Sequence, residues 1–170
     1  MVPMGYEEHK HLSPLCVNCA VIIISDSRDA KTDESGKLLV QGLKEKGHPV
    51  SSFEFINNDA EAVRLKFDEL LRREGLQAVI ASGGTGASRR DITVETVTPV
   101  LDKILPGFGE LFRAMSFEEI GTGAILSRAL AGVASGKVVI CLPGSVKAVK
   151  LALEKIIIPE IGHLVREASR

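Results

Sequence analysis

The feature that most constrains the fold of this chain is a series of short apolar runs separated by helical patterns. Residues 19–24 read Cys-Ala-Val-Ile-Ile-Ile and residues 78–81 read Ala-Val-Ile-Ala, which is typical of strands buried on both faces. Residues 50–56 alternate well enough to predict another strand. From position 60, apolar residues recur at the spacing of one helix face, and Gly75 ends that pattern. Strands and helices therefore alternate along the chain.

The C-terminal part of the chain predicts a hairpin followed by a helix. Residues 129–133 and 137–142 are apolar runs joined by Ser135-Gly136, a typical turn sequence. The final helical stretch should be kinked or restarted at Pro159, because proline lacks the N–H that a helix interior uses.

Two shorter helices are predicted before the hairpin, over residues 94–101, with Thr93 as a candidate N-cap, and over residues 106–115. Together these patterns predict an α/β fold of three αβα layers, with a mainly parallel sheet including one antiparallel strand from the C-terminal hairpin. In such sheets, ligands bind at the carboxyl ends of the strands.

Length and charge set the class of protein. The 170 residues fit a single domain over 16–170, preceded by a flexible N-terminal arm over 1–15 that lacks an apolar signal core. The 21 Lys and Arg nearly balance the 22 Asp and Glu, and no basic run carries interleaved aromatics, so we expect no nucleic-acid partner. Apolar stretches are too short to span a membrane. We expect a cytoplasmic protein.

Cys16 and Cys19 form a C-x-x-C pair. Such a pair could have a redox or metal-binding role, but a zinc site needs a second pair and a thioredoxin-type pair follows a strand. Here the pair precedes a strand, so we favour a structural interpretation. Cys141 ends an apolar run and is expected in the core.

The segment Ser82-Gly83-Gly84-Thr85-Gly86 directly follows a predicted strand. Its glycines permit positive φ and let the backbone approach a ligand closely. Successive N–H groups in such a turn, with the Thr85 hydroxyl, can bind an anion. The spacing matches neither a Walker loop nor the dinucleotide motif. The alternative is a tight turn between a strand and a helix.

Arg89 and Arg90 precede Asp91, five residues beyond Gly86. Guanidinium groups suit phosphate oxygens, whereas an aspartate beside a phosphate repels it unless a divalent cation lies between them. Aspartate with phosphate oxygens is a usual Mg²⁺ environment. The alternative is a surface Arg–Asp ion pair.

Three other loops offer similar groups. Ser25-Asp26 ends the first predicted strand, Ser127-Arg128 precedes the hairpin, and Pro143-Gly144-Ser145 begins the last helix, whose N–H groups favour an anion. Ser25 or Asp26 could equally cap a turn, and Ser145 could be an ordinary N-cap.

Several of these motifs in this order resemble the MogA/MoaB family of molybdenum-cofactor biosynthesis proteins, which is related to the gephyrin G domain. Residues 83–91 match its Gly-Gly-Thr-Gly-x-x-x-x-Asp signature, and residues 116–122 resemble the MoaB branch. The similarity continues through the other matching segments, residues 92–95, 106–110, 127–128, 131–133 and 142–145.

The resemblance implies a molybdopterin adenylyltransferase, in which the terminal phosphate of molybdopterin attacks the α-phosphate of Mg-ATP and pyrophosphate is released. It implies that the Gly-rich loop holds a substrate phosphate, that Asp91 holds Mg²⁺, and that Ser127, Arg128 and Ser145 line the pterin and phosphate pocket. It also implies a homotrimer or hexamer and hand-over of the product to a molybdenum insertase.

The chain departs from the family pattern after the second predicted strand. Family members usually carry Pro-Asp-Asp there, and the first Asp is taken as catalytic; here Asn58 takes that position and Asp59 the second. Three consequences are open: Asp59 supplies the catalytic and metal-binding carboxylate, turnover is weak, or the protein is a non-catalytic molybdopterin carrier or scaffold. A nucleotide-binding module of the same fold that takes no pterin is a more distant alternative.

Overall fold

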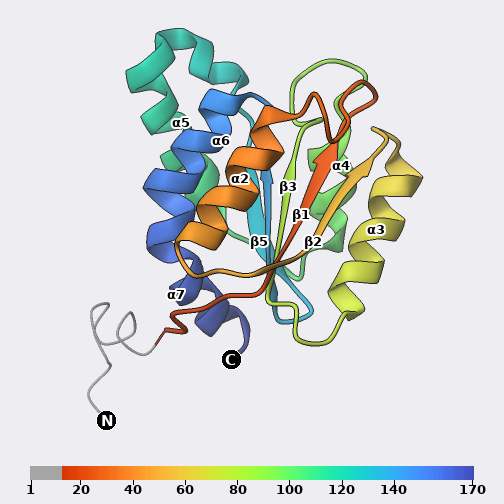
Figure 1. Ribbon diagram of the computed structural model, residues 1–170. Coiled ribbons are helices and arrows are strands. Elements are labelled where there is room, and N and C mark those ends of the chain that lie inside the picture. Colours follow the sequence, from red (N-terminus) through yellow and green to blue (C-terminus); the bar gives the residue numbers. More distant parts are fainter. Residues whose placement is uncertain (1–12) are drawn as a thin grey trace.

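The computed structural model describes residues 13–170 and contains a six-stranded sheet in the order β2-β1-β3-β6-β5-β4 (Figure 1). Strands β2, β1, β3 and β6 are parallel, and β5 runs antiparallel to both of its neighbours, β6 and β4. The predicted fold class is therefore confirmed. The strands are β1 (Cys19–Ile24), β2 (Val50–Ile56), β3 (Ala78–Ser82), β4 (Lys103–Ile104), β5 (Leu130–Ala134) and β6 (Lys137–Leu142).

The antiparallel strand β5 belongs to the predicted hairpin. Ala134 pairs with Lys137, so the connection is the two residues Ser135 and Gly136. Both have positive φ, 50° and 71°, as a tight two-residue hairpin turn requires.

Helices cover both faces of the sheet (Figure 1). Alternate strand residues pack on opposite sides: Val21 and Ile23 belong to the core beneath α2, α5, α6 and α7, whereas Ile22 belongs to the core beneath α3 and α4. This explains the continuously apolar strands. The helices are α2 (Glu34–Glu45), α3 (Ala60–Arg72), α4 (Thr93–Val97), α5 (Pro106–Ile120), α6 (Val146–Ala152) and α7 (Ile158–Ala168), with short 3₁₀ segments η1 (Thr98–Val100) and η2 (Gly121–Leu126).

The final helical stretch is divided, as predicted. A π-helical segment, η3 (Leu153–Ile157), joins α6 to α7, and Pro159 lies in the first turn of α7. The wider π turn accommodates the missing N–H of Pro159 without ending the helix.

Three local predictions were wrong. Thr93 is not an N-cap: its buried hydroxyl donates to the Gly83 carbonyl at 2.8 Å, and α4 begins without a side-chain cap. The helix predicted over 94–101 is a single α turn followed by η1, and α5 continues beyond residue 115 to Ile120.

Two expectations concern the ends and the environment of the chain. The N-terminal arm predicted over 1–15 lies largely outside the described residues, and the domain boundary stays a prediction. In the described part of this arm, the carbonyl of Pro14 lies close to Gly162 of α7. A Cβ added to Gly162 would lie 2.5 Å from the Pro14 oxygen. Among residues 13–170, no helix combines the length and the apolar character needed to cross a membrane.

Candidate functional site

Loops from three neighbouring parallel strands meet at one edge of the sheet. Ile23 of β1 pairs with Ser82 of β3, which pairs with Leu142 of β6, so the three strands end side by side. Their loops, together with the loop after β2, surround a hollow of about 470 Å³. It is lined by most of the residues singled out from the sequence: Ser25, Asp26, Asn58, Gly83, Gly84, Thr85, Gly86, Arg90, Asp91, Pro143, Gly144 and Ser145.

The Gly-rich loop lies where side chains do not fit. Gly83 has φ 111° and its N–H donates to the Leu142 carbonyl at 2.9 Å. A Cβ on Gly83 would clash with the Ile24 carbonyl oxygen. Gly84 has φ 63°, and a Cβ there would lie 2.6 Å from Asn58 Oδ1. Within residues 13–170, no backbone hydrogen bond uses the N–H of Gly84 or of Thr85, which leaves these donors for an anion.

The Asp91 carboxylate lies beside this loop. Its Oδ2 accepts hydrogen bonds from the Ser88 hydroxyl at 2.6 Å and the Ser88 N–H at 2.9 Å. The hydrogen bond from the Ser88 hydroxyl is the largest cause that lowers the pKa of Asp91 below its ordinary 3.8, despite partial desolvation. Asp91 is therefore a carboxylate at neutral pH, beside the backbone of Gly86.

Arg90 pairs with Asp26 rather than with Asp91. Arg90 Nη2 lies 3.3 Å from Asp26 Oδ2, while Asp26 Oδ1 accepts from the Asn58 N–H at 3.0 Å. Asp26 therefore connects the loops after β1, β2 and β3. Because the Arg90 side chain is 81% exposed, this ion pair is weak, and the guanidinium is available to an incoming anion.

The structure separates Asn58 from Asp59. Asn58 lines the hollow, and its Nδ2 donates to the Arg90 carbonyl. Its Oδ1 is buried and lacks a hydrogen-bond partner among the described residues. The Asp59 side chain caps α3, accepting from the Ala62 N–H at 2.9 Å, and does not line the hollow.

Three further predicted residues lie behind or beside the hollow. Ser82 is fully buried, and its hydroxyl donates to the Pro143 carbonyl at 3.3 Å. Arg128 donates to the Gly86 carbonyl at 2.9 Å and pairs with Glu95, so it supports the Gly-rich loop. Ser127 lines an adjacent hollow of about 410 Å³. Because Ser145 lines both hollows, the two are neighbours.

Sequence reasoning missed Arg28. This residue lines the hollow, and its Nη1 donates to the Gly144 carbonyl at 2.6 Å and to the Ser35 hydroxyl at 3.2 Å. Its only signal in the sequence is a position two residues after Asp26 in a loop that leaves a strand.

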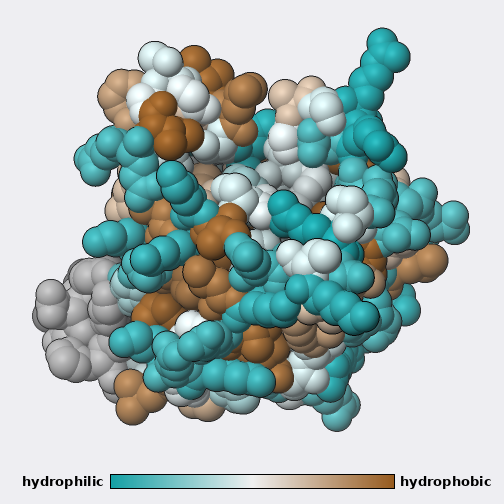
Figure 2. Space-filling model, turned by 45° about the horizontal axis from the view of Figure 1, so that its top comes forward, coloured by the Kyte–Doolittle hydropathy of each residue, from teal (hydrophilic) through white to brown (hydrophobic). Residues whose placement is uncertain are grey.

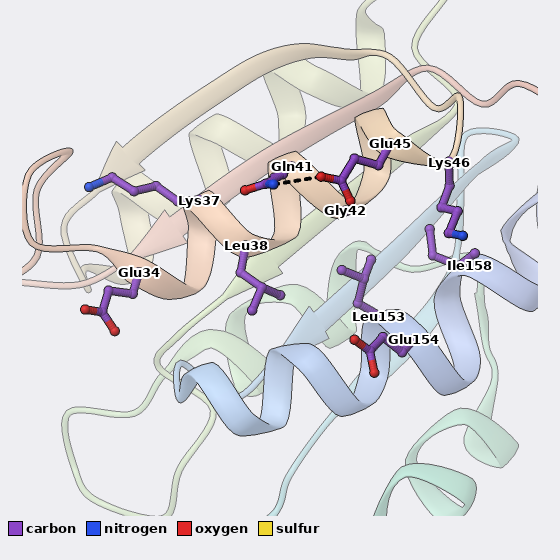
Figure 3. A pocket seen from close by; sticks show the side chains of 10 residues that line it. All are labelled: Glu34, Lys37, Leu38, Gln41, Gly42, Glu45, Lys46, Leu153, Glu154 and Ile158. Atoms are coloured by element: carbon purple, nitrogen blue, oxygen red, sulfur yellow. Dashed lines mark hydrogen bonds between the residues drawn. The ribbon is translucent and has the colours of Figure 1, made fainter.

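A larger hollow of about 810 Å³ lies between α2 and the α6–η3–α7 stretch (Figure 3). Leu38 and Leu153 point into the space between the helices, and Gln41 donates to Glu45 at 2.7 Å along its rim. No Gly-rich backbone lines it, and none of the residues predicted to bind a ligand does. We therefore assign the candidate site to the smaller hollow.

The cysteines offer no reactive thiolate in the core. Burial, with a smaller contribution from Cys16, raises the pKa of the Cys19 thiol to about 12, and burial raises that of Cys141 to about 12. Buried thiols with raised pKa values are inert. Residues 13–170 contain no group of three or more His, Cys, Asp or Glu side chains placed to hold a metal ion.

Comparison with known proteins gives consistent matches. A family model described as "Probable molybdopterin binding domain" matches residues 20–163. The chain is 45% identical to "Molybdenum cofactor biosynthesis protein B" of Bacillus cereus and 46% identical to the protein of that name in Bacillus subtilis. Each alignment covers 98% of this chain and 99% of the relative.

Solved structures agree with these matches. A crystal structure of a molybdenum cofactor biosynthesis protein B is 46% identical, has a TM-score of 0.87, and the match covers 89% of this chain and 95% of that one. The tungsten cofactor synthesizing protein MoaB from Pyrococcus furiosus is 39% identical, with a TM-score of 0.84, and the match covers 93% and 100% of the two chains.

Proposed function

The chain belongs to the family of probable molybdopterin-binding domains, and on this premise we propose that it acts in molybdenum or tungsten cofactor biosynthesis as a molybdopterin adenylyltransferase. The names of its relatives support the pathway. The observation that carries the activity is the hollow itself, in which unused backbone N–H groups, an ionised carboxylate and the guanidinium groups of Arg28 and Arg90 meet. These are the groups that phosphoryl transfer needs, because it depends on positioning and charge neutralisation.

In the proposed reaction, the terminal phosphate oxygen of molybdopterin attacks the α-phosphorus of ATP. A new P–O bond forms, the bond to the β-phosphate breaks, and pyrophosphate leaves. The N–H groups of Gly84 and Thr85 would hold one phosphate, and Arg90 would offset negative charge as the substrates bind. Ser145 would orient the pterin side, since it lines both neighbouring hollows.

Magnesium fits the donors of this site. Asp91 and Asp26 both line the hollow, and their carboxylate oxygens are ligands that Mg²⁺ prefers. Mg²⁺ keeps several waters and uses phosphate oxygens, so the small number of protein carboxylates suits it. When bound, it would neutralise charge on the phosphates. Asp59, also predicted as a metal ligand, faces α3 instead.

A molybdopterin carrier is the alternative, and Asn58 favours it. Asn58 lines the hollow where relatives are expected to have a carboxylate, and an amide brings no negative charge to a cation. Mixing purified protein with molybdopterin and Mg-ATP distinguishes the cases. The enzyme releases one pyrophosphate per adenylylated pterin, a carrier binds pterin and releases none, and a nucleotide-binding module binds ATP but no pterin.

Asn58→Asp should lower the melting temperature when no divalent cation is present. The substitution removes the hydrogen bond to the Arg90 carbonyl and places a charge against it, at an expected cost of about 1–3 kcal/mol. Adding Mg²⁺ should reverse the loss, because a cation between the carboxylate and the carbonyl restores attraction. Differential scanning calorimetry across a Mg²⁺ titration measures both effects.

Asn57→Asp is the matched control for that experiment, since Asn57 is exposed and adjacent; it should change neither melting nor its Mg²⁺ dependence. Asp59→Ala should cost about 1 kcal/mol of stability through loss of the α3 cap, at every Mg²⁺ concentration. If Asp59→Ala abolished the Mg²⁺ response and Asn58→Asp did not change it, the roles would be reversed.

We also propose that the protein self-associates, as a trimer or hexamer, through the end of the molecule formed by α5 and η2. Apolar atoms gather there at the upper left of Figure 2. Phe117, Ile120 and Ile125 are 58%, 54% and 76% exposed. A contiguous patch of exposed apolar side chains is typical of a protein–protein interface. Such an assembly could pass its product to a molybdenum insertase.

Replacing Phe117 and Ile125 together by aspartate should convert the assembly to monomers, because two buried, unpaired charges are costly. Light scattering after gel filtration measures the mass. Leu65→Asp is the control, since Leu65 is 53% exposed on α3, away from this surface. A wild-type protein that is monomeric at micromolar concentration would contradict the assignment.

A further inference from the structure

Arg28 is held at one nitrogen by the loop after β6 and by the start of α2. Its Nη1 donates to the Gly144 carbonyl at 2.6 Å and to the Ser35 hydroxyl at 3.2 Å. The same nitrogen lies 3.9 Å from Asp33 Oδ1. The two hydrogens of Nη1 are therefore both used.

The groups that hold Arg28 are themselves fixed. Asp33 is fully buried, and its Oδ2 accepts from the Gly36 N–H at 2.8 Å as the cap of α2. Its Oδ1 accepts from the Ser35 hydroxyl at 2.8 Å, and Ser35 is 2% exposed. A guanidinium anchored in this way loses little side-chain freedom when it binds a ligand.

The opposite edge of the guanidinium has no partner among the described residues. Arg28 has five donors, and every contact of its guanidinium within residues 13–170 is made by Nη1, none by Nε or Nη2. These two nitrogens lie side by side on the edge away from Nη1, at a spacing that matches two oxygens of a phosphate. The side chain is 37% exposed and lines the hollow.

This edge adjoins the Gly-rich loop. A Cβ on Gly144 would lie 2.9 Å from Arg28 Nη1 and 3.4 Å from both Arg28 Nη2 and the Gly83 Cα. Arg28 and the loop backbone therefore face one volume. The four ionisable lining residues, Asp26, Arg28, Arg90 and Asp91, carry no net charge, so an anion must be bound by local donors rather than by a general positive potential.

We propose that Arg28 binds a substrate phosphate through Nε and Nη2, as the fixed cation of the site. The Arg90 side chain, in contrast, is 81% exposed, and among residues 13–170 only Asp26 pairs with it. The phosphate belongs to the nucleotide or to the pterin, and that identity rests on the function proposed above. The binding of a phosphate oxyanion at Arg28 does not depend on turnover.

Calorimetric titrations with inorganic pyrophosphate, with ATP and with molybdopterin test the proposal. Arg28→Lys keeps the charge but removes the paired donors, and it should lower the affinity for the ligand whose phosphate binds Arg28 by about 10-fold to 100-fold. Arg28→Gln should lower that affinity at least as much. Arg64→Gln, which removes an equal charge from α3, where Arg64 pairs with Asp68, should leave all affinities unchanged.

The three ligands identify the phosphate. Loss of pyrophosphate and ATP affinity places a nucleotide phosphate at Arg28, and loss of molybdopterin affinity alone places the pterin phosphate there. Unchanged affinities for all three in Arg28→Lys and Arg28→Gln overturn the proposal. If binding depends on Arg28 but no pyrophosphate is ever released from ATP, the inference stands and the adenylyltransferase activity fails.

A second measurement needs no variant of Arg28. It tests the proposal even if the Arg28 variants fail to fold, which is a risk because Arg28 also connects two loops. Phenylglyoxal modifies accessible arginines, and mass spectrometry of the wild-type protein reports the rate at each one. The ligand that occupies the site should slow modification of Arg28 at least several-fold and leave Arg64 unchanged. Equal rates at Arg28 with and without each of the three ligands overturn the proposal.

Discussion

Asp91→Asn will lower pyrophosphate release by at least about 100-fold while molybdopterin still binds. An asparagine oxygen can keep the hydrogen bonds from Ser88, so the loop retains its shape and the variant removes mainly a negative charge. A charge that holds the cation at the reacting phosphate contributes about this much to the rate in comparable electrostatic sites. Single-turnover assays of pyrophosphate release measure the effect on the reaction, and a separate measurement of molybdopterin affinity gives the effect on binding.

Asp102→Asn is the matched control for Asp91. Asp102 Oδ2 also accepts from a backbone N–H, that of Ser135 at 2.7 Å, but at the hairpin turn. This variant should release pyrophosphate at the wild-type rate. Unchanged release in Asp91→Asn would remove Asp91 from the reaction, whatever its effect on stability.

Gly83→Ala should destabilise the fold strongly although it adds only one methyl group. At φ 111° an L-residue is strained, which costs about 1–3 kcal/mol. The added Cβ also clashes with the backbone oxygen of Ile24 at the end of β1, and a backbone atom cannot turn aside as the end of a side chain can. We expect a total cost above about 3 kcal/mol in urea unfolding.

Gly75→Ala separates the strain from the clash. Gly75 also has positive φ, 72°, but nothing lies within 4 Å of an added Cβ. It should cost only about 1 kcal/mol. Equal losses for the two variants would mean that the contact with Ile24 contributes nothing.

The sequence predicted those features whose cause is local. β1 and β3 are recognisable because both of their faces are buried, and the Ser135-Gly136 turn because its dihedral angles favour glycine. β4 escaped prediction because it is two exposed residues, Lys103 and Ile104, defined only by pairing with β5. Its pairing partner is not visible from local sequence.

The site shows the same division. The Gly-rich loop and Asp91 can be recognised from their residue types and from their position after a predicted strand. The role of Arg28 depends on Gly144, which is 116 residues away in sequence. Whether Asn58 or Asp59 faces the hollow depends on the residue at which α3 begins. The Asp59 side chain caps α3, so Asn58 is left to face the hollow. Neither relation has a local signature.

The pairing of β3 with β6 has a consequence for folding. Ile80 of β3 pairs with Ile140 of β6, so the two strands whose loops line the middle of the hollow come from distant parts of the chain. Such non-local pairing forms slowly. During synthesis, the Gly-rich loop emerges long before the strand that completes its surroundings. A phosphate ligand should therefore bind only after β6 has joined the sheet, and should slow unfolding of the finished domain without accelerating its assembly.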